Sequence, residues 1–336
     1  MHALEFDGQS GMTLVQRERP SPGAGEILIA PALVGICGTD LHLLDGDYPL
    51  GRFPRVAGHE FSGRVVAVGD GVTRFTPGDR ACVDPNITCG HCDRCASGAV
   101  NLCRKLVPVG VSVDGAFAEF VVVPEKIAYP LPAGLDAQAG ALIEPLACVL
   151  HGFERAPLPE GAAVLVYGAG SIGLLAIALA LHEGAARVDI IEPSPVRRRA
   201  ALEFGAHAAF APGERAICRD VDYVIEASGN RSAVADALSH LAPRGVLLQM
   251  GVCPPDASTP LAPFDLFDRE LTLVGSQSLS GAYARAIDVM GQLADLPAKL
   301  VSHVYDLQYA REAFTMARSE NARKILIRCN DGAEQD

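Results

Sequence analysis

Hydrophobic and polar positions follow two different rhythms along this chain. In residues 25–129 the apolar positions form short β-rich runs broken by Gly and Pro, such as Glu26–Ala30, Phe61–Val68 and Phe117–Val123. Runs of this kind, bounded by turn residues, predict an all-β, barrel-like domain with long loops. From about residue 160 the pattern changes to alternating strand-like and helix-like segments.

The alternating half predicts a parallel sheet with helices on its faces. Strands are expected at 163–167, 187–191, 208–210, 222–226, 245–250 and 270–275, and helices at 172–183, 195–204 and 231–241. Six strands, several of them separated by helices, are typical of a doubly wound α/β sheet. A last apolar strand, Lys324–Ile327, could return to complete the first domain.

The change of rhythm predicts where the domains divide. We expect a β-rich domain over residues 1–148 with a cysteine-rich lobe at 85–104, an α/β domain over 149–281, and a segment, 282–336, that returns to the first domain. A chain of 336 residues is long enough for two such domains, each with its own core.

One apolar stretch, residues 162–181, has the length of a membrane helix and no charged residue. Three glycines interrupt it, and a buried strand, a tight turn and a buried helix give the same hydropathy. The N-terminus has neither a basic region nor an apolar region of a signal peptide. We therefore expect a cytoplasmic protein without a membrane partner.

Composition narrows the class of partner. With 28 Lys and Arg against 40 Asp and Glu, the formal net charge is −12, whereas nucleic-acid binding needs a positive field. A hydrophobic fraction of 49% excludes a wholly disordered chain. Four of the ten cysteines fall within fifteen residues, which favours a metal site in a reducing compartment over a disulfide framework.

A dinucleotide fingerprint begins the α/β half. The sequence Gly168-Ala-Gly170-Ser171-Ile172-Gly173 follows an apolar strand and opens an apolar helix, which is the context that a G-x-G-x-x-G motif requires. The first glycine permits a tight turn, the second lets the backbone approach a pyrophosphate, and the third permits close packing of helix on strand. The helix N-terminus adds partial positive charge.

The choice between NAD and NADP depends on the residue that ends the next strand. Glu192 lies 19 residues beyond Gly173, where a carboxylate can accept hydrogen bonds from a ribose diol and repel a 2′-phosphate. Arg197, which begins a run of three arginines, argues the other way unless it lies on a solvated helix face. We expect NAD as the cofactor.

The cysteine cluster has the spacing C-x2-C-x2-C-x7-C, formed by Cys89, Cys92, Cys95 and Cys103. Four thiolates on one compact loop suit a closed tetrahedral Zn²⁺ site, whose role would be structural because no position is left for a substrate. An iron–sulfur cluster is the alternative, but the x7 gap and the missing Cys-Pro favour zinc.

A second group of metal-ligand residues lies upstream. Cys37 is found in Gly35-Ile-Cys37-Gly-Thr39-Asp40-Leu-His42, and Gly58-His59-Glu60 follows. Together with the cysteine lobe and the fingerprint, these motifs resemble those of the zinc-dependent medium-chain alcohol dehydrogenases, over essentially the whole chain. The resemblance implies a GroES-like β-barrel catalytic domain and a Rossmann domain.

The same resemblance implies roles for individual residues. Cys37 and His59 would ligate a catalytic zinc, so that the chain carries two Zn²⁺ ions. Glu60 ligates the metal in the polyol branch, and Glu144, in Glu144-Pro-Leu, stands where other members have a cysteine ligand. We expect Glu144, and not Cys148 four residues on, to be the ligand at this position; Glu60 or Glu144 would complete the set. Thr39 and His42 would relay the proton, and Asp40 would orient a ligand.

The Glu144-Pro-Leu pattern resembles that of polyol dehydrogenases. It implies hydride transfer from a secondary alcohol of a pentitol or hexitol to NAD, giving a ketose, by a tetramer or dimer. Residues 275–279 lack the Arg-Tyr pair common in sorbitol-type enzymes, which argues against sorbitol itself. The alternatives are a sugar (aldose) 1-dehydrogenase, a general secondary-alcohol dehydrogenase, and a non-enzymatic zinc-containing binding or structural protein.

Overall fold

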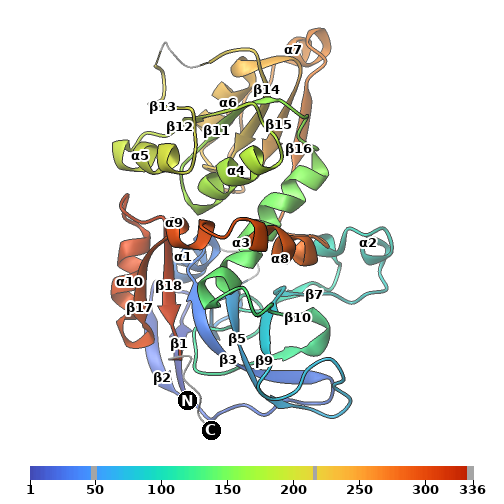
Figure 1. The fold of residues 1–336 in the computed structure, drawn as a ribbon, viewed down its shortest axis with the longest axis vertical. Helices are drawn as coiled ribbons and strands as arrows, with labels where there is room; N and C mark the ends of the chain where they lie inside the picture. Colours follow the sequence, from blue (N-terminus) through green and yellow to red (C-terminus); the bar gives the residue numbers. More distant parts are fainter. Residues whose placement is uncertain (47–50, 215–217, 331–336) are drawn as a thin grey trace. The chain divides into compact units, whose positions relative to one another are not determined.

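The computed structural model describes residues 1–46, 51–214 and 218–330. The chain forms two compact units, Met1–Glu144 with Tyr283–Asp336, and Pro145–Ala282. Figure 1 labels the helices and strands of both units. The change of hydrophobic pattern predicted these divisions at residues 148 and 281.

The first unit is mostly β-structure. Its main sheet has the order β10-β6-β5-β3-β18-β17, with β9 also paired to β3. A second sheet has the order β2-β1-β4, and β7 pairs with β8. The strands are β1 (His2–Phe6), β2 (Met12–Gln16), β3 (Glu26–Gly35), β4 (Arg55–Val56), β5 (Glu60–Val68), β6 (Arg80–Val83), β7 (Asn86–Ile87), β8 (Val107–Pro108), β9 (Val121–Pro124), β10 (Ala128–Pro130), β17 (Val301–Asp306) and β18 (Lys324–Arg328).

Short helices connect these strands. They are α1 (Gly38–Asp45), α2 (Asp93–Ala96), α8 (Tyr283–Gln292), α9 (Leu296–Leu300), α10 (Ala310–Ala317) and the 3₁₀ turns at Val100–Leu102, Glu125–Ile127 and Leu307–Tyr309. The longer α3 (Ala137–Arg155) begins in this unit and ends in the other.

The C-terminal segment completes the core of the first unit. The apolar run 324–327 lies in β18, which pairs antiparallel with β3. Phe314 on α10 packs edge-to-face against Phe6 and Phe117, with ring centroids 5.4 and 5.7 Å apart. Aromatic pairs in this geometry stabilise a core beyond the area that they bury.

One predicted strand begins later than expected. The apolar run Phe117–Val123 enters a regular ladder only at Val121. Upstream of that point the backbone bonds irregularly, because the N–H groups of Ala116 and Phe117 donate to the carbonyls of Gly58 and Ala57. Residues 116–117 therefore support the loop that carries His59.

The second unit is a doubly wound α/β domain, which confirms the predicted fold class. Its parallel sheet has the order β13-β12-β11-β14-β15-β16, and helices cover both faces (Figure 1). The elements are β11 (Ala163–Tyr167), α4 (Ser171–His182), β12 (Arg187–Ile191), α5 (Pro195–Glu203), β13 (Ala208–Phe210), β14 (Val221–Glu226), α6 (Arg231–His240), β15 (Leu241–Gln249), α7 (Pro263–Asp268) and β16 (Thr272–Gly275).

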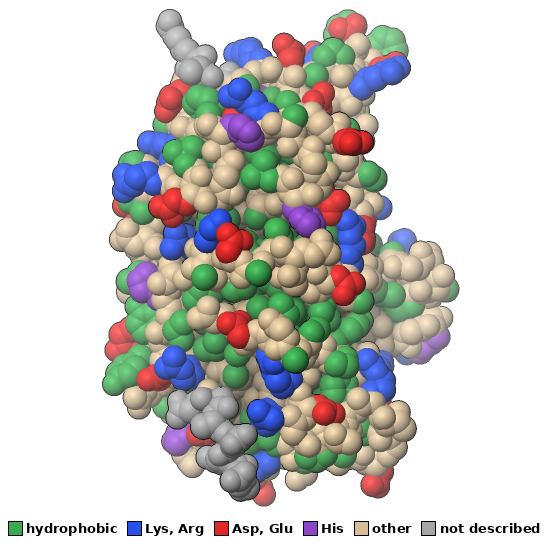
Figure 2. All heavy atoms as spheres, viewed as in Figure 1, with side chains coloured by type: hydrophobic (Ala, Val, Ile, Leu, Met, Phe, Trp, Pro, Cys, Tyr) green, Lys and Arg blue, Asp and Glu red, His purple; other side chains and the backbone are tan. Residues whose placement is uncertain are grey.

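The apolar stretch 162–181 is a strand, a turn and a helix, β11 and α4. Among the described residues, no helix combines the length and apolarity that crossing a bilayer requires. On the face drawn in Figure 2, acidic and basic side chains are interspersed, so that face has no broad basic field for nucleic acid.

Candidate metal centre and cofactor site

Two paired strands of the first unit bring Cys37 and His59 together. β3 ends at Gly35, which is paired with Glu60, the first residue of β5. Cys37 follows β3 and is the N-cap of α1, and His59 immediately precedes β5. One donor atom each of Cys37, His59 and Glu60 lies within 4.8 Å of the other two.

Asp40 connects the two ligand-bearing segments and is completely buried. Its Oδ2 atom accepts a hydrogen bond from the backbone N–H of Cys37 at 2.8 Å, and Oδ1 accepts one from the N–H of Gly58 at 3.3 Å. Oδ1 also lies 3.5 Å from Nδ1 of His59. With Nδ1 directed at a carboxylate, Nε2 is the nitrogen left for a metal.

The donor set attracts cations. Burial lowers the pKa of His59, but the Asp40 carboxylate and the Cys37 sulfur outweigh it and hold that pKa well above its usual value. Lys324, which is buried, donates to Glu60 at 2.5 Å. Sulfur, imidazole and carboxylate are the donors of catalytic zinc sites, which keep one position open. The residues present therefore fit a zinc ion.

Other proposed residues lie on α3 and α1. Glu144 is 6% exposed and is not among the three donors grouped within 4.8 Å in the described part of the chain. Burial lowers the pKa of Lys324, but the charges of Glu60, Cys37 and Glu144 raise it above its usual value. The charge of Glu144 therefore also favours the protonated form of Lys324.

Thr39 and His42 both belong to α1 and are three residues apart. Residues at this spacing are neighbours on one face of a helix. Thr39 is half-buried and His42 is exposed. The pair therefore runs from the region of Cys37 toward solvent.

Three polar residues were absent from the sequence-based candidates: Lys324 and Tyr283, which are buried, and Asp84, which is half-buried. Burial, and then the charges of Cys82, Asp84 and Glu144, raise the pKa of Tyr283 well above its usual value. Burial raises the pKa of Asp84 to about 6. A charged residue at the start of the apolar run 324–327 was the one available signal for Lys324.

The four cysteines of the lobe form a compact cluster. Neighbouring sulfurs are 3.5 Å apart for Cys89 and Cys103, 3.6 Å for Cys92 and Cys95, and 3.9 Å for the Cys89–Cys95 and Cys92–Cys103 pairs. Four sulfurs at about 2.3 Å from a central zinc ion are about 3.8 Å from one another, so the spacing fits a tetrahedral site.

Backbone groups favour the thiolate forms of two of the four cysteines, whereas burial and the neighbouring sulfurs raise the pKa of Cys95. The N–H of Arg104 lowers the pKa of Cys92 to about 6, and the N–H of Cys89, donating to Sγ of Cys103 at 3.3 Å, lowers the pKa of Cys103. Arg104 also forms a two-armed ion pair with Asp93, at 2.6 and 2.8 Å. This ion pair links the residue after Cys92 to the residue after Cys103, so it holds the two ends of the cluster together.

The glycine fingerprint of the second unit has open space over its turn. Gly168 has a φ of +93°, and a Cβ on Gly173 would lie 1.8 Å from the carbonyl oxygen of Gly168, so both positions require glycine. A Cβ on Gly170 would meet nothing within 4 Å. Ser171 and Ile172 begin α4, whose N-terminus faces this space.

Glu192 follows β12 and is 4% exposed. Its Oε2 atom accepts a hydrogen bond from the N–H of Ala169 at 2.8 Å, and Oε1 accepts one from the N–H of Ser194 at 2.9 Å. The carboxylate therefore also joins the glycine turn to the start of α5. Arg197, in the first turn of α5, is half-buried, and its N–H donates to Oγ of Ser194 at 3.4 Å.

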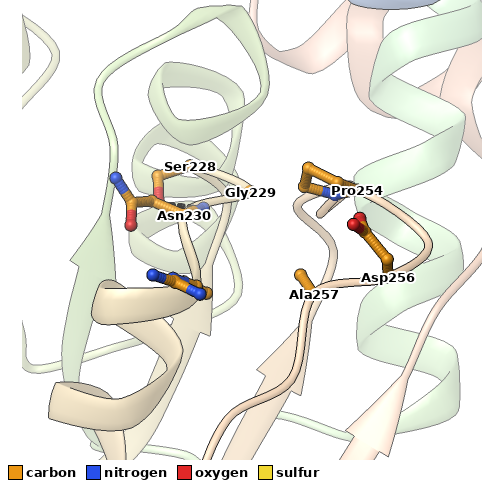
Figure 3. Close-up of a pocket in the computed structure, with 7 residues that line it drawn as sticks. Ser228, Gly229, Asn230, Pro254, Asp256 and Ala257 are labelled. Atoms are coloured by element: carbon orange, nitrogen blue, oxygen red, sulfur yellow. Dashed lines mark hydrogen bonds between the residues drawn. The ribbon is translucent and has the colours of Figure 1, made fainter. Parts of the chain in front are cut away.

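A cavity of about 450 Å³ lies between the loops that follow β14 and β15. Figure 3 shows Ser228, Gly229 and Asn230 facing Pro254, Asp256 and Ala257 across it. Ligands of doubly wound sheets bind at these carboxyl ends of the strands.

Glu226, at the end of β14, holds the first of these loops and was not a sequence-based candidate. It is completely buried and accepts hydrogen bonds from the N–H groups of Ser228 and Gly229 and from Nε2 of Gln249.

Two family models match the chain. The alcohol dehydrogenase GroES-like domain matches residues 23–133, and the zinc-binding dehydrogenase domain matches residues 171–292. The first model falls within the β-rich unit and the second mostly within the α/β unit, which confirms the predicted combination of domains.

Three named relatives are similar to this chain over nearly their whole length. D-altritol 5-dehydrogenase of Agrobacterium fabrum is 37% identical over 96% of this chain and 97% of its own. Sorbitol dehydrogenase of Halalkalibacterium halodurans is 32% identical, with coverages of 95% and 96%. L-galactonate-5-dehydrogenase of Escherichia coli is 33% identical, with coverages of 89% and 90%.

Solved structures agree with the same assignment. A zinc-binding dehydrogenase from Sinorhizobium meliloti bound to NADP has a TM-score of 0.93, 36% identity and coverages of 97% and 98%. An alcohol dehydrogenase from Escherichia coli in complex with NADH has a TM-score of 0.91, 29% identity and coverages of 98% and 99%. This chain belongs to the zinc-binding dehydrogenases of the zinc-dependent, medium-chain alcohol dehydrogenase superfamily.

Proposed function

We propose that this chain oxidises a secondary alcohol of a polyol to a ketone, passing the hydride to NAD. The observation that carries the proposal is the three-donor group of Cys37, His59 and Glu60, backed by the buried Asp40. Full-length similarity to dehydrogenases named for altritol and sorbitol supports the substrate class.

In this proposal Cys37, His59 and Glu60 hold a catalytic zinc ion, with Glu144 as the alternative carboxylate. When bound, the ion acts as a Lewis acid that makes the alcohol proton easier to remove. Asp40 keeps the imidazole of His59 in one orientation. The four cysteines of the lobe hold a second, structural zinc ion.

The proton would leave along α1. Thr39 would exchange it through its hydroxyl, and His42, three residues on and exposed, would release it to solvent. A histidine suits this position because its unperturbed pKa of about 6.5 is close to neutral pH.

The cofactor would lie on the glycine turn, with its pyrophosphate over Gly170 at the N-terminus of α4, against Ser171 and Ile172. Glu192 favours NAD because its carboxylate at the end of β12 repels a 2′-phosphate. One structurally similar dehydrogenase is bound to NADP, so the preference of this chain for NAD over NADP has to be measured. Arg197 is the residue that would favour NADP.

The position of the oxidised carbon is open to a direct test. The relatives named for altritol and for L-galactonate are both 5-dehydrogenases, so a C5 hydroxyl of a polyol or of a sugar acid is the favoured site. A panel of C4–C6 alditols, aldonates and aldoses, followed at the NADH absorbance band, separates the classes.

The products decide among the outcomes of this panel. A ketose from an alditol supports the proposal, and a keto-acid from an aldonate extends it. A lactone from an aldose would show a 1-dehydrogenase instead. A folded, zinc-loaded protein without turnover on any class would refute it in favour of a binding protein.

We also infer that the chain forms a homo-oligomer, a dimer or tetramer, in the cytoplasm. β16 is the last strand of its sheet, and Leu273 on it and Phe264 and Phe267 on α7 are 44%, 69% and 80% exposed. A sheet edge beside exposed apolar side chains favours pairing with another chain. Sedimentation of the wild type and of Leu273→Lys tests this.

The ten unbridged cysteines support a reducing compartment, as the cytoplasm is.

A further inference from the structure

Lys324 is a buried cation 264 residues away in sequence from the carboxylate that it contacts. It is the first residue of β18 and is 2% exposed. Its Nζ atom donates to Oε2 of Glu60 at 2.5 Å and to the carbonyl oxygen of Ile36 at 3.1 Å. Ile36 immediately precedes Cys37, so the ammonium group touches both ligand-bearing segments.

A second, independent contact fixes the same oxygen. Gly35 is paired with Glu60 across β3 and β5, and a Cβ at Gly35 would lie 2.1 Å from Oε2 of Glu60. The carboxylate of Glu60 therefore packs against the backbone of Gly35 on one side and contacts the ammonium group of Lys324 on the other. Oε2 is occupied, and Oε1 is the oxygen left for a metal.

The fold gives little reason for a charge at this position. The next three residues of the strand, Ile325–Ile327, are apolar and buried, and a buried ion pair can be replaced by packed apolar residues with little or no loss of stability. The pair instead places a positive charge beside donors that would hold a divalent cation. Lys324 and a metal ion would then compete for the charge of one carboxylate.

We propose that Lys324 is a positioning residue for the metal centre, which limits Glu60 to one oxygen and keeps its bond to the metal weak enough to yield to an incoming alcohol. This inference rests on the proposed function, because it assumes that Cys37, His59 and Glu60 hold the catalytic ion. Lys324 acts through Glu60 and does not itself touch the substrate.

The test is competition for zinc between the full-length protein and a chromophoric chelator. In Lys324→Met, Glu60 keeps its full charge for the metal, so the affinity of this site should rise about tenfold or more. Lys324→Arg, which retains the charge, should stay within about threefold of the wild type. The four-cysteine site of the same molecule is the internal control and should not change.

A double-mutant cycle with Glu60→Gln shows whether Lys324 acts through Glu60. Once Glu60 is an amide, adding Lys324→Met should change the zinc affinity less than about threefold. Turnover gives a second readout: kcat of Lys324→Met should fall about tenfold while KM for NAD is unchanged.

The outcomes separate this inference from the proposed function. A wild type with only its structural zinc would refute the proposed function and this inference with it. A wild type with both ions, and a Lys324→Met variant of equal or weaker zinc affinity, would overturn the role of Lys324 alone. An equal loss of thermal stability with and without zinc, at unchanged affinity, would show a structural ion pair instead.

Discussion

Oδ1 of Asp40 lies 3.5 Å from Nδ1 of His59, while the other oxygen of the same carboxylate accepts the backbone N–H of Cys37. One buried side chain therefore sets the orientation of the imidazole and the path of the backbone at the thiol. Outer-shell carboxylates of this kind raise the basicity of a histidine ligand and fix its tautomer.

Asp40→Asn should weaken zinc binding at the Cys37 site about tenfold to a hundredfold, because an amide neither holds the imidazole tautomer nor supplies charge. Chelator competition measures the effect. Asp45→Asn, on the exposed part of the same helix, is the matched control and should behave as the wild type. Equal zinc affinity in both variants would show that Asp40 only caps α1.

Glu192→Ala should lower the ratio of kcat/KM for NAD over NADP at least about tenfold, because the charge that repels a 2′-phosphate is lost. Since Glu192 also accepts the N–H groups of Ala169 and Ser194, Glu192→Gln is the milder variant that keeps one acceptor oxygen. Glu203→Gln, exposed on α5, is the control. An unchanged ratio in a folded Glu192→Ala protein rejects the ribose contact.

The contribution of Asp84 to the stability of the wild type should fall as the pH rises from 4 to 6. Burial raises the pKa of Asp84 from 3.8 to about 6, so in this window the unfolded chain has lost a proton that the folded chain still holds. Asp84→Asn has no carboxyl group at this position, so its stability does not fall for this reason. Between pH 4 and pH 6 its unfolding free energy should therefore rise by ~2 kcal/mol relative to that of the wild type.

Chemical denaturation at pH 4 and pH 6.5 measures this difference. Asp70→Asn, at an exposed position, supplies the control. A difference between Asp84→Asn and the wild type that is the same at both pH values would mean that Asp84 is solvated in the folded protein.

Cys92→Ser should remove the structural zinc ion and leave the catalytic one in place. Three sulfurs hold the ion less tightly than four, and the lobe braced by Asp93 and Arg104 would lose its centre. Proteolysis within residues 89–103 should become faster. Cys253→Ser, a cysteine outside both clusters, should retain both ions. Full zinc content in Cys92→Ser would count against a four-thiolate site.

Much of the α/β unit could be predicted because each signal is local. The run Ala163–Tyr167, the three glycines and the helix after them lie within about twenty residues, and their strand, turn and helix are confirmed within one residue. The start of the strand near residue 117 was harder to predict. The N–H groups of Ala116 and Phe117 donate to the carbonyls of residues 57–58, which are far away in the sequence.

Lys324 could not be recognised from the sequence as a neighbour of Glu60. Its contact with Glu60 depends on the pairing of β18 with β3 and of β3 with β5, which no local pattern specifies. Asp84 and Tyr283 were missed for the same reason. Cys37, His59 and Glu60 were recognisable because their residue types are those of a zinc site, and the structure brings their donor atoms together.

Zinc content per chain, measured by atomic emission on the wild type and on Cys37→Ser, tests the central proposal most directly. We expect about two zinc ions in the wild type and about one in the variant, which should keep its cofactor binding while losing turnover. One ion in the wild type, or two in a folded Cys37→Ser protein, would contradict a catalytic zinc held by Cys37, His59 and Glu60.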